Sequence, residues 1–319
     1  MSDGTVGSSS ERLLRAYQTQ EKRFVERRFP LRFEPEVPAI RELYSQAKSF
    51  RWNPETEIAW SRLDLERYSR ETREAARLVW SRRAWGAYPG LGESTALLVR
   101  FCLESGAIGM DAKLFLSFRP AEEAKHLEVC LTLAERLGGY VPDPGDEILS
   151  RISNHPFAQA ALDPDLPIEA FVAAIGALDD QIELNLLSSH LKHADNEVIR
   201  QALRLIAGDK QRHVLFAWSL LGSRLPALDE PRRAAVTSAA RDMLERVILA
   251  GYRNTWLLPA PSRDAWLRAE AETAARGLGA STMVQEQSVL RATIAQVRER
   301  LAVWGIVLPL ATHPEMGTF

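Results

Sequence analysis

Four segments of this chain place apolar residues every three or four positions, and the alternation typical of β-strands is almost absent. The segments cover about residues 91–104, 112–137, 167–191 and 196–222. Side chains at this spacing share one face of an α-helix and can pack against neighbouring helices. We therefore expect an all-α fold with a bundle of four central helices.

The flanking segments extend this fold. Residues 1–10 are small and polar and indicate a disordered tail, followed by a helical domain over 11–230. Pro89-Gly90 should separate the helix that precedes the bundle from its first central helix, because proline ends helices. Residues 231–319 should form a helical extension that packs on the same domain or supports a homodimer. The further helices are expected near residues 11–28, 39–49, 64–87, 232–250, 263–276 and 284–303.

Composition excludes several classes of protein. The chain has 319 residues, 46% of them hydrophobic and 26% charged, with a net charge of −2, so no nucleic-acid partner is indicated. No apolar run approaches the roughly 18–20 residues of a membrane span, and no apolar signal region opens the chain. The two cysteines form no disulfide framework, so we expect a reducing cytoplasm.

Polar residues interrupt the apolar stripes of the four central segments. Glu123 lies three residues before His126 on one stripe, and steps of four and three residues place Lys210 and His213 on another. An unpaired buried charge costs several kcal/mol, so such groups pair with each other or bind a cation. The polar residues expected in the interior are Glu93, Glu123, His126, Glu183, Lys210 and His213.

These residue types suit a metal site. A Glu and a His three apart lie on one helical face and can hold one ion together. Mixed oxygen and nitrogen ligands suit iron or manganese, and zinc less well. Taken singly, Glu93 and Glu183 are also compatible with surface acids or core ion pairs, and His213 with a satisfied core histidine.

The order of these residues resembles that of ferritin-like di-metal carboxylate bundles: an acid, Glu-x-x-His, an acid, then an acid with a His. Gly92-Glu93 and the Glu-Ala-Lys-His motif at 123–126 resemble hydroxylase large subunits of bacterial multicomponent monooxygenases. The motif Asp-Lys-Gln-Arg-His at 209–213 resembles the Asp-Glu-x-Arg-His segment of those hydroxylases, of acyl-carrier-protein desaturases and of ribonucleotide reductase small subunits. The resemblance covers about residues 90–220 and implies a non-haem, ferritin-like protein.

The resemblance also implies a set of metal ligands. Glu93, Glu123 and His126 would serve one ion, Glu183 and His213 would serve the other, and Glu123 would bridge them. The cofactor would be two iron ions, with manganese or a mixed iron and manganese pair as alternatives.

Four neighbouring positions refine this comparison. Glu122 and Asp209 match acids that orient the histidine of the opposite motif. Cys130 matches a position held by Cys in some hydroxylases and by a radical Tyr in the reductase subunit, although a small core residue is the alternative. Ile206 stands where p-aminobenzoate N-oxygenase relatives carry an extra histidine, so the chain departs from that subgroup.

Lys210 stands where the resemblance expects the second bridging glutamate. Asp209 could turn inward to replace that ligand, or a neutral Lys210 could bind metal directly. Lys210 could also take up carbon dioxide as a carbamate, which restores a bridging carboxylate, or act as a sacrificial catalytic reagent. In the last alternative its ammonium forms a salt bridge with the acids and leaves room for one ion or none.

We expect an enzyme, a di-iron oxidoreductase that uses O2 to hydroxylate, N-oxygenate or desaturate a small organic substrate. Its electrons would come from a reductase, a small reductant or the substrate. Aromatic side chains would shape the substrate pocket or simply pack in the core: Phe101, Phe115, Phe118, Phe216 and Trp218. The alternative is a ferritin-like metal-binding, radical or scaffold subunit without oxygenase turnover.

Overall fold

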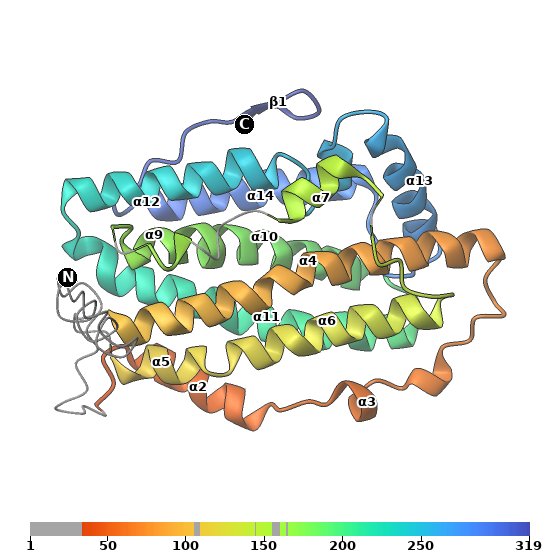
Figure 1. Ribbon diagram of the computed structural model, residues 1–319, viewed down its shortest axis with the longest axis horizontal. Helices are drawn as coiled ribbons and strands as arrows, with labels where there is room; N and C mark the ends of the chain where they lie inside the picture. Colours follow the sequence, from red (N-terminus) through yellow and green to blue (C-terminus); the bar gives the residue numbers. More distant parts are fainter. Residues whose placement is uncertain (1–33, 105–108, 144, 155–159, 164) are drawn as a thin grey trace, which may run out of the picture.

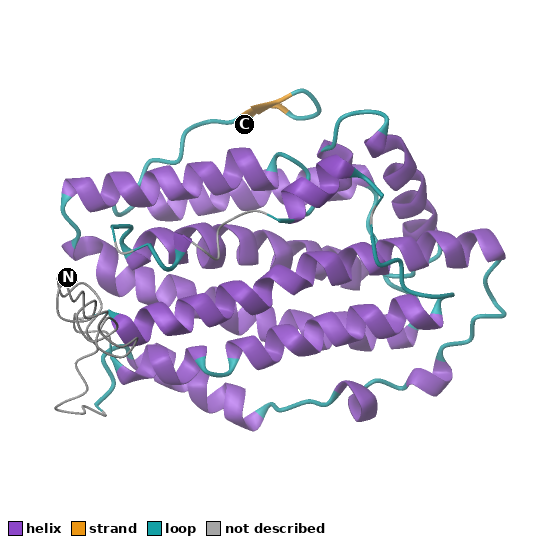
Figure 2. Cartoon of the chain, viewed as in Figure 1, coloured by secondary structure: helices purple, strands orange, loops and turns teal. Residues whose placement is uncertain are grey.

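The computed structural model describes residues 34–104, 109–143, 145–154, 160–163 and 165–319. The tail expected over 1–10 and the helix expected over 11–28 lie outside the described residues. Across the described part the chain is helical, and its strands are the short β1 (Thr312–His313) and β2 (Gly317–Thr318) near the C-terminus (Figure 2). The expected all-α class is confirmed.

Four central helices form the bundle. α4 (Arg70–Leu103) packs along α6 (Arg119–Arg136), and α10 (Asp180–His193) packs along α11 (Glu197–Arg224) (Figure 1). The side chain of Asn196 caps α11 by accepting hydrogen bonds from two backbone N–H groups of its first turn.

The other helices surround this bundle. α12 and α14 lie along one side of it in Figure 1, and α2 and α3 lie along the opposite side. α14 packs against α10, α13 packs against α4, and buried residues of α12 and α14 join the same apolar core as the central helices. Their bounds are α2 Pro38–Ser49, α3 Pro54–Glu57, α5 Met110–Leu116, α7 Glu147–Ser153, α9 Ile168–Val172, α12 Glu230–Met243, α13 Ser262–Ala275 and α14 Met283–Ala302. Short 3-10 turns are η1 Trp60–Arg62, η3 Leu225–Ala227 and η5 Thr255–Leu257.

The helix break expected at Pro89-Gly90 is wrong, since α4 continues through Pro89. A proline inside a helix removes one backbone hydrogen bond and disturbs the preceding turn. Here the Tyr252 hydroxyl donates a hydrogen bond to the Gly86 carbonyl in that turn, at 3.0 Å. Packing of α4 along α6 on both sides of Pro89 therefore outweighs the local cost of the proline.

The uninterrupted helix expected over 112–137 is also wrong, because α5 ends at Leu116 and α6 begins at Arg119. Pro120 lies in the first turn of α6, where its missing N–H costs nothing, so the chain restarts a helix there.

The third central helix contains a π-helical segment, η2 (Ala173–Asp179), between α9 and α10. A Cβ on Gly176 would lie 2.5 Å from the Cβ of Ala217, so only glycine permits this approach of η2 to α11. π-helical turns recur at functional sites, and this one ends directly before Asp180. A second π-helical segment, η4 (Leu244–Ile248), follows α12.

Among the described residues, no helix combines the length and the apolar character that a bilayer crossing requires.

Candidate metal centre

Charged side chains from all four central helices meet in the interior of the bundle. Each is at most 4% exposed, except Glu183, whose side chain is 16% exposed. The cluster consists of Glu93 from α4, Glu122, Glu123 and His126 from α6, Asp180 and Glu183 from α10, and Asp209, Lys210 and His213 from α11. The sequence-predicted site residues of these helices are thus brought together.

Two imidazoles face the centre in matching orientations. His126 directs Nδ1 toward Glu123 Oε2 (3.2 Å) and Nε2 toward Asp209 Oδ2 (3.1 Å). His213 directs Nε2 toward Glu122 Oε2 (2.8 Å), and its Nδ1 lies 3.3 Å from Glu123 Oε1. Each imidazole therefore contacts Glu123 through Nδ1 and an acid of the opposite helix through Nε2.

His126 carries a strongly perturbed pKa. Burial opposes its charged form, but the hydrogen bonds to Asp209 and Glu123 outweigh burial and raise its pKa to about 9. Without a metal, a proton on His126 supplies positive charge between the two carboxylates.

Lys210 contacts three carboxylates. Its Nζ lies 2.7 Å from Glu183 Oε2, 2.9 Å from Glu123 Oε1 and 3.3 Å from Asp180 Oδ1. Burial alone would lower its pKa, but these three acids hold the pKa well above the usual value for lysine. The side chain is therefore an ammonium group in this arrangement.

Arginines surround the same acids. Arg119 donates to Asp180 Oδ2 at 2.7 Å, and Arg212 donates to Glu122 at 2.6 Å and also to Asp209. Arg253, which follows η4, contacts Asp179 at 2.6 Å and Glu183 Oε2 at 3.1 Å. Acids of the cluster, including Asp180, are thus paired with arginine side chains.

Asp180 is the residue that sequence reasoning missed. Glu123, Asp180 and His213 each offer one ligand atom, and these atoms all lie within 4.8 Å of one another, as binding to a single metal ion requires. His213 Nδ1 is buried and has no hydrogen-bond partner, although Glu122 fixes the opposite ring nitrogen. A buried imidazole nitrogen without a donor or acceptor partner is costly unless it binds a cation.

A sequence signal for Asp180 exists. Glu93 precedes Glu123 by 30 residues, and Asp180 precedes Lys210 by the same 30 residues. This equal spacing marks Asp180 as the counterpart of Glu93, and in the structure Asp180 Oδ1 lies 3.3 Å from Lys210 Nζ.

Solved structures of known proteins share the fold of this chain. No family model matches the chain, and no curated protein matches its sequence. A solved R2-like ligand-binding oxidase with an aerobically reconstituted Mn/Fe cofactor is similar, with a TM-score of 0.62, 17% identity, and coverage of 84% of this chain and 92% of that one. Another, an R2-like ligand-binding oxidase with its metal cofactor after photoconversion, has a TM-score of 0.62 and 16% identity over 85% and 93%. The chain has the fold of the R2-like ligand-binding oxidases. The expected ferritin-like architecture is confirmed.

Within this R2-like fold, the donors that meet differ from the inferred ligand set. Glu93 and His126 lie outside the group formed by Glu123, Asp180 and His213, and Glu183 contacts Lys210 and Arg253. Burial, reinforced by neighbouring acids, raises the pKa of Glu93 to about 8. The ligand roles inferred for Glu93, Glu183 and His126 stay predictions.

Cys130 lies beside the centre. It lines a cavity of about 60 Å³ together with His126, Glu183 and Arg253. Burial raises the pKa of its thiol to about 12, so the thiol is protonated at neutral pH and lacks the thiolate character of a reactive cysteine.

Asp209 connects the centre to the protein surface. The indole N–H of half-buried Trp52 donates to Asp209 Oδ2 at 2.9 Å, and the Trp52 ring stacks on His126 with centroids 6.4 Å apart. Lys125 lies over the Trp52 ring and 3.5 Å from Asp209 Oδ2. Through these contacts, Trp52 and Lys125 hold Asp209 and thereby orient His126 from the surface side of the centre.

The aromatic side chains expected around a substrate pocket mostly pack on each other. Phe115 stacks on Phe216 at 4.9 Å and meets the edge of His213 at 6.4 Å, and Phe101 lies 6.2 Å from Phe216. Trp218 donates to Gln181 at 3.1 Å. These contacts form a core wall beside the centre.

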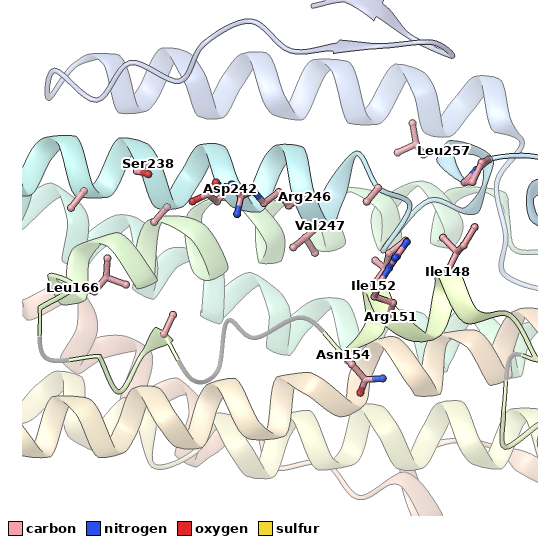
Figure 3. A pocket seen from close by; sticks show the side chains of 15 residues that line it. Ile148, Arg151, Ile152, Asn154, Leu166, Ser238, Asp242, Arg246, Val247 and Leu257 are labelled. Atoms are coloured by element: carbon pink, nitrogen blue, oxygen red, sulfur yellow. Dashed lines mark ion pairs between the residues drawn. The ribbon is translucent and has the colours of Figure 1, made fainter.

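A larger cavity of about 970 Å³ lies between α7 and the α12–η4 helix (Figure 3). Its lining is largely apolar and includes Ile148, Ile152 and Val247, with Arg151 and Arg246 among them. None of the charged side chains of the centre lines this cavity.

Proposed function

We propose that this protein is a metal-dependent oxidase that uses dioxygen to oxidise a small organic molecule, with its centre among Glu123, Asp180 and His213. The observation that carries this proposal is the buried Nδ1 of His213, which has no hydrogen-bond partner and lies beside Glu123. Carboxylate oxygen and imidazole nitrogen donors suit iron or manganese. The names of the structurally similar oxidases, which include an Mn/Fe cofactor, support the same chemistry.

The residues of this chain would hold and orient the ion. Glu123, Asp180 and His213 would supply ligand atoms, while Glu122 and Asp209 would fix the two imidazoles through their Nε2 atoms. A bound reduced iron or manganese ion supplies electrons for the activation of dioxygen. An electron donor must restore those electrons after each turnover.

We infer that Lys210 stays protonated and acts as an ammonium group with a fixed position. Its three carboxylate contacts of 2.7–3.3 Å favour the charged form. Carbamate formation and direct ligation both need a neutral amine, which the same three carboxylates disfavour. The ammonium would instead set the charge of the centre and hold the carboxylates in place.

The test is oxygen consumption after anaerobic loading with ferrous iron. We expect the wild-type chain to consume dioxygen, and His213→Ala to lower both bound iron and consumption at least tenfold, as loss of a ligand does. His313→Ala, near the C-terminus on β1, serves as the control and should match the wild type. Full iron binding and full consumption in His213→Ala would overturn the proposal.

A metal-binding subunit without turnover is the second candidate. It is favoured by Lys210, whose ammonium already pairs with three acids of the centre. This candidate predicts bound metal with no oxygen consumption above that of the free ion, so the same measurement separates the two functions.

A further inference from the structure

Two of the three donors that could hold a metal ion are already in contact with Lys210. Its Nζ lies 2.9 Å from Glu123 and 3.3 Å from Asp180. We infer that the centre binds one divalent metal ion, held by Glu123, Asp180 and His213, and that the Lys210 ammonium takes the place of a second ion. This inference deepens the proposed metal-dependent function and rests on it.

The arrangement of donors supports a single ion. Among the described residues, one group of acids and histidines brings at least three ligand atoms within 4.8 Å of one another, and its members are Glu123, Asp180 and His213. Glu183 is not in this group, and its Oε2 lies 2.7 Å from Lys210 Nζ and 3.1 Å from Arg253. The donors that meet therefore form one site.

The ring nitrogen of His213 that lacks a hydrogen bond indicates where the single ion binds. His213 Nδ1 is buried, lacks a hydrogen bond, and lies 3.3 Å from Glu123 Oε1. His126 differs, because both of its ring nitrogens have hydrogen-bond partners among the acids. The imidazole nitrogen available to bind a cation is therefore His213 Nδ1, which lies near Asp180.

The ammonium of Lys210 already supplies positive charge at the centre. Buried charge must be closely balanced, because uncompensated charge in a protein interior costs several kcal/mol. Lys210 Nζ lies within 2.7–3.3 Å of Glu123, Asp180 and Glu183, where a second ion would otherwise balance these acids.

Replacing Lys210 by Glu changes the charge of the centre by −2, which is the charge that a second divalent ion would balance. It also places a carboxylate where the ammonium now contacts Glu123, Asp180 and Glu183. The substitution Lys210→Glu should therefore create the second site.

The test is metal stoichiometry measured with Mn²⁺ after removal of unbound ions, by elemental analysis and calorimetric titration. We expect one ion per chain in the wild type, two in Lys210→Glu and one in the control Lys192→Glu, since Lys192 is exposed on the same bundle. Two ions in the wild type, or one in a folded Lys210→Glu variant, would overturn the inference.

Electron paramagnetic resonance of the Mn²⁺-loaded wild type gives a second measurement that does not depend on folding of the variant. A single ion gives an uncoupled six-line signal, whereas two adjacent ions give an exchange-coupled spectrum, which would contradict the inference. Oxygen consumption is scored separately after iron loading. One bound ion without oxygen consumption would contradict the oxidase proposal alone. Two bound ions with oxygen consumption would contradict the single-ion inference alone. No bound ion would contradict both.

Discussion

At the scale of single residues, the centre is organised by acids that hold imidazoles. Asp209 receives hydrogen bonds from both Trp52 and His126, and Glu122 holds His213. A ring nitrogen that is fixed on one side presents the other nitrogen in a defined direction. The paired arrangement explains why two acids outside the three-donor group are as deeply buried as the donors.

The substitution Asp209→Asn tests this arrangement in metal-free protein. Hydrogen bonds to Asp209 and Glu123 raise the pKa of His126 in the folded protein to about 9, above the ordinary histidine value of 6.5. Its charged form therefore stabilises the fold fully below pH 6.5, and this contribution is lost as pH rises through 9. The shift corresponds to on the order of 3 kcal/mol. We expect Asp209→Asn to lower the free energy of unfolding at pH 6 much more than at pH 9.5, measured by urea denaturation.

The control for that measurement is Asp264→Asn, which removes an exposed acid on α13 and should change stability by less than about 0.5 kcal/mol at either pH. Equal losses for Asp209→Asn at pH 6 and pH 9.5 would mean that Asp209 does not control the proton on His126.

At the scale of helices, α4 passes unusually close to the centre at Gly90. A Cβ there would lie 2.9 Å from Glu123 Oε2 and 3.0 Å from its Cδ. Gly86, one turn earlier, has space, because its added Cβ would meet only Arg253 Nη1 at 3.9 Å. Gly86 therefore provides a matched control for a substitution at Gly90 on the same helix.

We expect Gly90→Ala to push the Glu123 carboxylate aside and weaken Mn²⁺ binding at least tenfold in calorimetric titration. The α-helical content should stay unchanged, because alanine favours helix over glycine by about 1 kcal/mol. Gly86→Ala should bind Mn²⁺ as the wild type does. Unchanged binding in Gly90→Ala would show that Glu123 is free to move without loss of a ligand.

The helices also show what the sequence could and could not predict. Glu123, His126 and His213 were predictable, because helical spacing alone puts them on buried faces. The continuation of α4 through Pro89 was not, because the packing that outweighs proline is contributed by α6, far along the chain. Asp180 was missed although its spacing to Lys210 was a signal, because Asp179 and Glu183 lie within the same five residues and η2 sets which of the three faces inward.

At the scale of the whole molecule, the C-terminal part of the chain reaches into the centre. Arg253 lies beyond α12 and η4, yet it contacts Asp179 and Glu183, and Tyr252 beside it hydrogen bonds to α4. No sequence pattern predicted these contacts, because Arg253 lies outside residues 90–220, to which the sequence resemblance extends. The segment from α12 onward thus supplies charge compensation to the bundle as well as apolar packing.

The substitution Arg253→Met tests this dependence. It removes the cation that faces Asp179, whose side chain is 3% exposed, and leaves both acids with less compensation. Loss of one partner of a buried ion pair costs about 3–5 kcal/mol. We expect a loss of this size in the free energy of unfolding by urea denaturation. Arg246→Met is the matched control, because Arg246 is 79% exposed in its pair with Asp242 and surface pairs contribute at most about 1 kcal/mol. If both variants are equally stable, the C-terminal part does not support the centre through charge.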